Sequence, residues 1–176
     1  SVNGGPVKPG HEEDWSTYRH DASRSGRGSC RVSAELKQEW KVKIPGGRPS
    51  SPVIADGRVL VACLDTHTVS ALNAEDGQPI WSFSAGGRVD SPPTIHNGTA
   101  IFGSADGRIY CLDAADGRLV WSFLAAPEDR RIVAFEQVES VWPVHGSVLV
   151  QDGVLYCVAG RSMFLDGGLR WLKLDP

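Results

Sequence analysis

The sequence lacks the marks of several large protein classes. No apolar run approaches the roughly 20 residues that a membrane-spanning helix needs, so we expect no membrane span. Acidic residues outnumber basic ones, 21 to 18, and a net charge of −3 predicts no nucleic-acid partner. Residues 1–15 have neither the charged start nor the apolar stretch of a signal peptide, and long helical periodicity is nearly absent.

Cysteine is also scarce, and its spacing excludes several kinds of site. The four cysteines form no adjacent pair, no CxxC and no haem-attachment motif; they are Cys30, Cys63, Cys111 and Cys157. The last three lie inside apolar runs, so we expect small buried core residues, although a disulfide between two of them remains open. The histidines occur singly, without a nucleophile motif such as G-x-S-x-G. We therefore assign no catalytic, cofactor-binding or metal-binding residue.

Glycine, by contrast, is abundant, with 20 residues, and many follow Asp or Asn. Such pairs tolerate the positive φ angles of tight hairpin turns, and most are flanked here by Val, Ile, Leu or Tyr. This pattern predicts an all-β chain.

A repeat organises these turns. Residues 51–83 align with residues 91–123: both open with Ser-Pro, pass three turn signals and end in Trp-Ser-Phe. Each unit reads as four short strands, and a period of about 40 residues with four strands is typical of a β-propeller blade. A third copy starts near Ser147, and Glu35 to Ile44 resembles a lone outermost strand.

The repeat gives the following predicted organisation. It comprises an N-terminal lead-in (1–34), the orphan outer strand of a preceding blade (35–50), two blades (51–90 and 91–123), a long inserted loop (124–146) and an incomplete blade (147–176). Closed propellers need at least four blades, so we expect a partial propeller. Alternatively, several chains could assemble through their open blade edges, the orphan strand of one completing the third blade of another.

The stretches "ALNAEDGQPIW" and "CLDAADGRLVW" resemble the tryptophan-docking motif of the bacterial PQQ-like β-propeller repeat family, the pyrroloquinoline-quinone enzymes and their non-enzymatic relatives. In that family the Trp stacks on the neighbouring motif and fastens blade to blade. The resemblance assigns docking roles to Ala71, Gly77, Trp81, Gly117, Trp121 and Trp40. Asn73 and Cys111 depart from the Asp and Ala of the pattern.

The resemblance leaves the activity open. In quinoprotein dehydrogenases the cofactor is held by adjacent cysteines, a stacking aromatic residue and a calcium site, and none of these can be assigned here. We therefore expect a non-catalytic scaffold or binding module, with a protein partner or the remaining blades as its partners. A quinoprotein oxidoreductase whose PQQ and calcium sites lie in other blades is the alternative, as is an accessory propeller of a larger exported enzyme. The resemblance also favours a periplasmic or otherwise exported bacterial protein.

Two insertions supply candidate recognition residues. The stretch 124–146 is far longer than the connector 84–90, and a second insertion covers 160–168. Long connectors are often functional, and Arg presents a planar fork of donors to carboxylate or phosphate. The predicted ligand or partner surface consists of Arg130, Arg131, Trp142, His145 and Arg161. An elaborated connector whose charges pair with one another is the simpler interpretation.

Overall fold

The computed structural model describes residues 14–176, and every regular element in this range is a β-strand. The first sheet contains β1 (Val53–Ala55), β2 (Arg58–Cys63), β3 (Thr68–Asn73) and β4 (Pro79–Ser84). The second contains β5 (Thr94–His96), β6 (Thr99–Gly103), β7 (Arg108–Asp113) and β8 (Leu119–Leu124). The third contains β11 (Leu149–Gln151), β12 (Val154–Ala159) and β13 (Arg170–Leu174).

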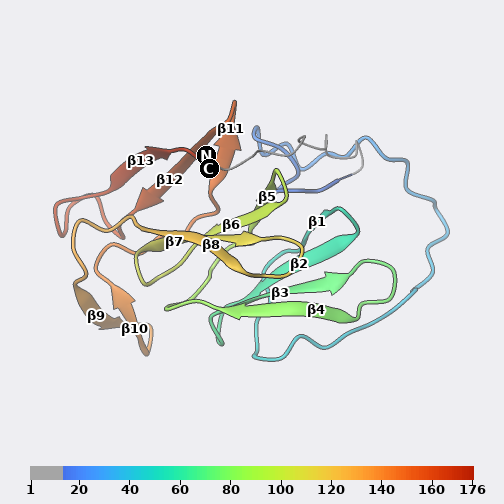
Figure 1. Ribbon diagram of the computed structural model, residues 1–176, viewed down its shortest axis with the longest axis horizontal. Helices are drawn as coiled ribbons and strands as arrows, with labels where there is room; N and C mark the ends of the chain where they lie inside the picture. Colours follow the sequence, from blue (N-terminus) through green and yellow to red (C-terminus); the bar gives the residue numbers. More distant parts are fainter. Residues whose placement is uncertain (1–13) are drawn as a thin grey trace.

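All pairings are antiparallel between strands that are consecutive in sequence, and the sheets pack one after another (Figure 1). β1 contacts β5 and β5 contacts β11, so the first strands of the three sheets are neighbours. This is an unclosed array of propeller blades, which confirms the predicted fold class. The third sheet has three strands within the described residues.

Turn chemistry explains the strand boundaries. Asp56–Gly57, with φ of 50° and 71°, joins β1 to β2, and Asn97–Gly98 and Asp152–Gly153 occupy the same place in the other sheets. Two consecutive positive φ angles define the hairpin turn whose twist matches that of the flanking strands. The Asp-Gly and Asn-Gly signals therefore set the start of each sheet.

The core lies between the sheets. The largest buried cluster joins the second and third sheets and includes Ile101, Ile109, Trp142, Val144 and Leu155. Three cysteines are buried in these sheets, whereas Cys30 is exposed, and all four are free thiols. The expectation of buried core cysteines is therefore confirmed for the three that lie on strands.

The lead-in segment connects the sheets. Trp15 exchanges two backbone hydrogen bonds with Ile54 of β1 (2.7 and 2.9 Å), and the carbonyl of Ser16 accepts one from Ile95 of β5 (2.7 Å). The guanidinium of Arg24 then donates to the carbonyl of Val148, just before β11 (3.3 Å). The described part of the lead-in thus bonds to the edges of β1 and β5 and to the carbonyl just before β11. Residues 1–13 lie outside the described residues.

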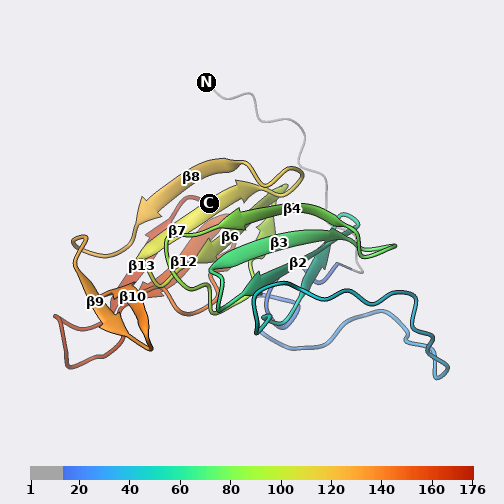
Figure 2. The same ribbon diagram turned by 90° about the horizontal axis from the view of Figure 1, so that it is seen from below.

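Two segments differ from the sequence-based expectation. The sequence predicts an orphan outer strand over residues 35–44, but these residues form no strand and pair with none of the described sheets. The stretch 124–146 is not an irregular loop: it contains a hairpin of β9 (Arg131–Ala134) and β10 (Gln137–Ser140). Figure 2 shows this hairpin projecting from the end of the second and third sheets.

Candidate functional site

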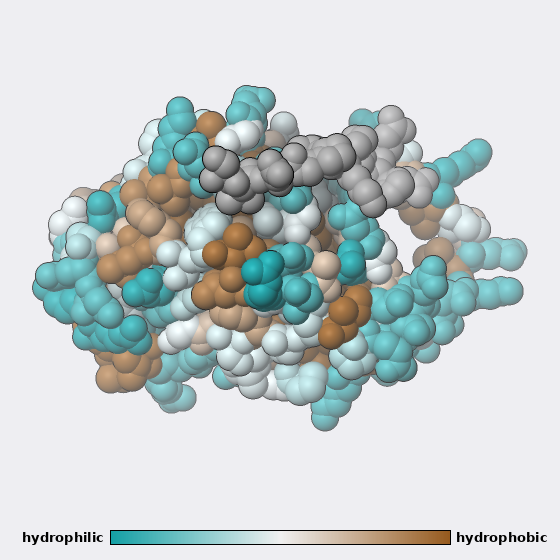
Figure 3. Space-filling model, in the orientation of Figure 1, coloured by the Kyte–Doolittle hydropathy of each residue, from teal (hydrophilic) through white to brown (hydrophobic). Residues whose placement is uncertain are grey.

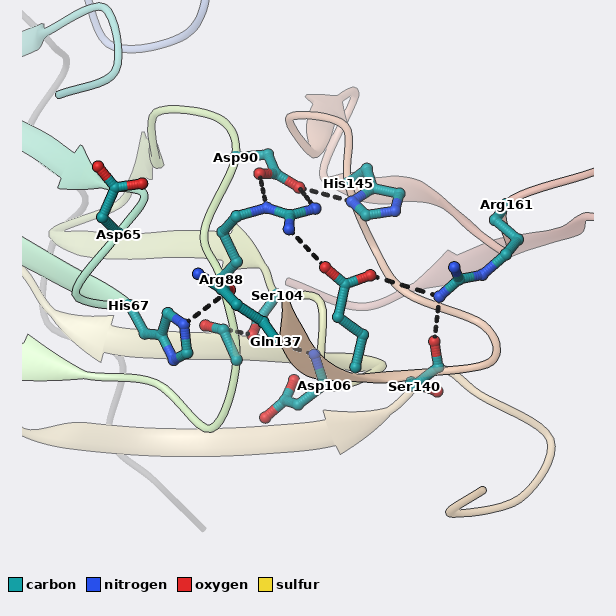
Figure 4. Close-up of polar contacts among 12 residues, drawn as sticks. Asp65, His67, Arg88, Asp90, Ser104, Asp106, Gln137, Ser140, His145 and Arg161 are labelled. Carbon is teal, nitrogen blue, oxygen red and sulfur yellow. Dashed lines mark hydrogen bonds and ion pairs between the residues drawn. The ribbon is translucent and has the colours of Figure 1, made fainter. Parts of the chain in front are cut away.

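In an antiparallel meander, the turn after the second strand lies at the end of the sheet where the first strand begins and the fourth strand ends. Residues 64–67, 85–93, 104–107, 125–148 and 160–169 meet there, and we call this the connector end. Its polar side chains form the network in Figure 4.

A buried carboxylate stands at the centre of this network. Glu139 of β10 has a fully buried side chain that lies between two arginines. Its Oε1 is 2.5 Å from Nη1 of Arg88, an ion pair without the alignment of a hydrogen bond. Its Oε2 accepts from Nη2 of Arg161 (3.3 Å), which also donates to the carbonyl of Ser140 (2.8 Å). A buried charge needs such partners, so Glu139 fixes the hairpin to two other connectors.

A second carboxylate extends the network toward the third sheet. Oδ1 of Asp90 accepts from Nε of Arg88 (2.5 Å), and Oδ2 pairs with Nδ1 of His145 (2.5 Å). Burial raises the pKa of Asp90, but the hydrogen bonds from His145 and Arg88 outweigh it and hold that pKa below its ordinary value. The hydrogen bond to Asp90 likewise raises the pKa of Arg88. Both groups are therefore charged at neutral pH.

A second buried acid, Asp106, braces the connector between the first two sheets. The hydroxyl of Tyr110 donates to Asp106 (2.5 Å) and accepts from the backbone N–H of Gly86 (3.2 Å). Burial, reinforced by the Asp106 carboxylate, raises the pKa of Tyr110 to about 12. At Gly87, a Cβ would lie 2.6 Å from the backbone nitrogen of Asp106, so only glycine fits this close approach.

The structure distributes the predicted surface residues among several partners. Arg130 pairs with Asp166 (2.8 Å) and lies over the ring of Trp142, 4.9 Å from its centroid. Trp142 is buried, and its indole N–H donates to the carbonyl of Asp166 (2.7 Å). Arg131 pairs with Asp129 (3.1 Å). An external anion would therefore compete with carboxylates of the chain itself for these arginines.

The residues assigned to tryptophan docking repeat one geometry. The indole N–H of Trp81 donates to the carbonyl of Ala114 in the next sheet (3.0 Å). Its ring covers Gly117, where a Cβ would lie 2.6 Å from the ring. Ala71, fully buried, is directly opposite Trp81 in the β3–β4 register. The small residues thus leave room for the indole.

Trp40 makes the equivalent contacts one repeat earlier. Its indole N–H donates to the carbonyl of Ala74 (3.0 Å), and its ring covers Gly77. Trp121 is half-buried and packs against the core between the second and third sheets, near Leu174. The docking role of these residues stays a prediction.

An apolar groove of about 470 Å³ lies between residues 42–45 and the outer strands β3 and β4. Its walls include Val42, Ile44, Ile80 and Trp81. A smaller groove of about 310 Å³ lies beside β8 and the end of β13. The smaller groove therefore lies between the second and third sheets.

Sequence reasoning missed Arg88, Asp90, Asp106 and Tyr110. One signal was present: Gly-Gly-Arg occurs at residues 46–48 and again at 86–88, in equivalent connectors. In the first copy, Arg48 pairs with the exposed Asp65 (3.0 Å). In the second copy, the equivalent Arg88 pairs with the buried Glu139. Among residues 14–176 no group of three or more His, Cys, Asp or Glu side chains could hold a metal ion, and no helix could span a membrane.

Comparisons with known proteins agree with this architecture. An outer membrane protein assembly factor BamB from Shewanella oneidensis is 30% identical over 77 residues, which cover 44% of this chain and 20% of the relative. The chain thus spans about a fifth of that protein's length.

Solved structures with the same fold include proteins of two kinds. BamB from Moraxella catarrhalis superposes with a TM-score of 0.56 at 21% identity, covering 78% of this chain and 36% of that one. Quinohemoprotein alcohol dehydrogenase ADHIIG from Pseudomonas putida HK5 gives 0.65 at 20% identity, covering 85% and 23%. At these identities the likeness concerns the fold alone.

A family model described as outer membrane protein assembly factor BamB matches residues 23–172, which is most of the chain. The chain therefore belongs to this family of PQQ-like β-propeller repeat proteins.

Proposed function

We propose that this chain is part of a non-catalytic propeller that works as a protein-binding scaffold in the assembly of outer-membrane proteins, in the periplasm or otherwise outside the cytoplasm. The observation that carries the proposal is the connector end. There the inserted β9–β10 hairpin is fixed at the end of the sheets by the ion pairs of Glu139 with Arg88 and Arg161, which we call the Glu139 clamp. Rigid presentation lowers the entropic cost of binding a partner.

The network itself supports a structural use of its charges. The two arginines, Arg88 and Arg161, balance the carboxylates of Glu139 and Asp90. His145 also pairs with Asp90. Groups that are already paired in this way hold loops in place. The family match to an assembly factor supports the same assignment.

The test uses the full-length protein in its bacterial host. Deleting the gene should lower the amount of folded outer-membrane β-barrel protein, and the intact gene should restore it. Unchanged barrel levels would contradict the proposal. So would PQQ- and calcium-dependent reduction of an artificial electron acceptor by the purified protein in the presence of an alcohol, which is the outcome expected for a quinoprotein oxidoreductase.

One observation favours a quinoprotein oxidoreductase as the second candidate function. It is the fold similarity to quinohemoprotein alcohol dehydrogenase, whose chain is much longer. In that case the PQQ and calcium sites would lie in further blades. An accessory propeller of a larger exported enzyme would instead show an unrelated catalytic domain in the same gene.

The remaining blades are the proposed occupants of the groove beside β4. Trp40 anchors the chain beside the first sheet, and the groove between residues 42–45 and that sheet has apolar walls. Light scattering coupled to size exclusion should give a monomer for the full-length protein. A closed oligomer would instead mean that copies complete each other's blades.

A further inference from the structure

The β9–β10 hairpin has one unpaired edge. The backbone N–H of Val141 donates to the carbonyl of Arg130 (2.9 Å), which sets the alternation of the ladder. Because antiparallel pairing alternates, Ile132 directs its backbone groups toward β10, whereas Arg131 and Val133 direct theirs outward. Within residues 14–176, no backbone hydrogen bond reaches these outward groups.

The opposite edge of the hairpin is partly occupied. The backbone N–H of Ser140 in β10 donates to the carbonyl of Ala105 (2.7 Å), which holds β10 against the second sheet. β9 is the outer strand in both Figure 1 and Figure 2. A free strand edge is a template for pairing with another chain.

Apolar side chains surround the β9 edge. Val133 and Val138 are opposite each other in the register, so their side chains share one face, and they are 79% and 55% exposed. Phe135, at the tip, is 75% exposed. Single exposed apolar residues are ordinary, but a cluster on one projecting element is typical of an interaction site.

The neighbouring loop adds to this surface. Residues 163–165 (Met-Phe-Leu) are all exposed, Phe164 by 89%. Asp166 joins this loop to the base of the hairpin through its ion pair with Arg130 and its carbonyl bond from Trp142. Figure 3 shows apolar patches separated by hydrophilic residues at this end of the molecule.

The charges beside these apolar side chains are mainly acidic. Four exposed carboxylates stand against two guanidinium groups, a balance of −2; the carboxylates are those of Glu128, Asp129, Glu136 and Asp166, and the guanidinium groups those of Arg130 and Arg131. Such a rim repels an anionic phospholipid surface and attracts basic side chains. A protein segment with basic flanks therefore fits this surface better than a membrane does.

We propose that the outer edge of β9 binds an extended segment of a partner protein, which adds as a third strand to the hairpin. The segment carries apolar residues at alternate positions, against Val133 and Val138, and basic residues at its flanks. Backbone hydrogen bonds to Arg131 and Val133 supply the pairing, and the side chains select the partner. This inference rests on the proposed scaffold function and names the partner's chemistry.

The probe is the peptide Lys-Lys-Val-Thr-Val-Thr-Val-Lys-Lys, titrated into the full-length protein. Binding should slow hydrogen exchange at the amides of Arg131 and Val133. Val133→Pro removes the outward N–H without breaking a ladder bond and should weaken binding about tenfold or more. The matched control is Val133→Ala, which shortens the same side chain but keeps the outward N–H, and it should weaken binding less than Val133→Pro does. Slow exchange at Ile132 in both variants verifies that the hairpin is folded.

Two further peptides test the chemistry. Glu in place of the flanking Lys should weaken binding about tenfold at low salt, with the difference fading at high salt. N-methylation of the backbone groups that face β9 should abolish binding. Equal binding of the methylated peptide, equal binding by Val133→Pro, or protected Arg131 and Val133 amides in the free protein would each overturn the inference. So would binding to phosphatidylglycerol vesicles in preference to the peptide.

The two proposals fail separately. If Val133→Pro restores β-barrel levels in the deletion strain as well as the intact gene does, strand addition at β9 is wrong while the scaffold function stands. If deletion leaves barrel levels unchanged, the scaffold function fails whatever the peptide does.

Discussion

The Glu139 clamp makes a quantitative prediction about stability. The side chain is fully buried, and its partners Arg88 and Arg161 are 11% and 20% exposed. Removing one member of a buried ion pair typically costs about 3–5 kcal/mol, because the other charge stays buried without a partner. Arg88 keeps Asp90, so the lower half of that range, about 3 kcal/mol, is expected for Glu139→Ala.

Glu139→Gln separates charge from shape. It keeps the volume and one oxygen acceptor for Arg161, and we expect a loss of about 2 kcal/mol, because a hydrogen bond to a charged group contributes roughly 1.5–3 kcal/mol. The double variant Glu139→Leu with Arg161→Met should recover part of the loss, since apolar replacement of a whole buried pair is often neutral.

Urea unfolding followed by tryptophan fluorescence measures these differences. The slope of the unfolding free energy against urea should stay constant across the variants, so that shifts in midpoint report stability. The matched control is Glu136→Gln, on the exposed tip of the same hairpin, which should change stability by less than about 0.5 kcal/mol. A loss below about 1 kcal/mol for Glu139→Ala would refute the clamp, because it would mean that the carboxylate is hydrated in solution.

Three other measurements test separate parts of the structure. Trp81→Phe removes the indole donor between sheets and should lower stability by about 1 kcal/mol, whereas Trp171→Phe, on a side chain 75% exposed, should change it by less than about 0.5 kcal/mol in the same urea assay. The folded-state pKa of Asp90 lies below its ordinary value of 3.8, so its stabilisation is present above that value and is lost as pH falls through the folded pKa. The stability gap between the wild type and Asp90→Asn should therefore begin to narrow below about pH 4 and close as pH falls through the folded pKa, and a gap that does not change with pH would contradict the ion pairs drawn for Asp90. Ellman's reagent at pH 8 should label the exposed Cys30 in the native protein but Cys157, whose pKa burial raises to about 11, only after unfolding; equal labelling rates would contradict the packing.

Most of the fold can be predicted from the repeat, because the turn residues that separate its strands act locally. Asp-Gly and Asn-Gly pairs specify positive φ angles directly, so strand spacing followed from the sequence. The hairpin between β9 and β10 escaped this reasoning because its turn consists of Phe135 and Glu136. Both adopt positive φ, 51° and 62°, although residues without glycine's freedom rarely do. No turn signal marked them.

The candidate site was less predictable because it depends on distant contacts. Arg88 and Glu139 lie 51 positions apart and meet only when the β9–β10 hairpin packs against the second sheet. Periodicity within a strand shows which face is buried, but not which connector a buried carboxylate will meet. The sequence marks the charged insertions as unusual, and the simpler interpretation of them is that their charges pair with one another. Arg130 with Asp166 and Arg131 with Asp129 form such pairs, but the sequence does not show which partners meet.

The lead-in has a consequence for the order of folding. Each sheet is a meander of neighbouring strands, so its contacts close short loops and can form early. Arg24 instead meets the carbonyl of Val148 across a separation of 124 residues. Closing so long a loop is slow, and it cannot precede the arrival of β11. The contact of Arg24 with the chain before β11 is therefore among the last to form, and its formation should be the slow phase that completes the native structure.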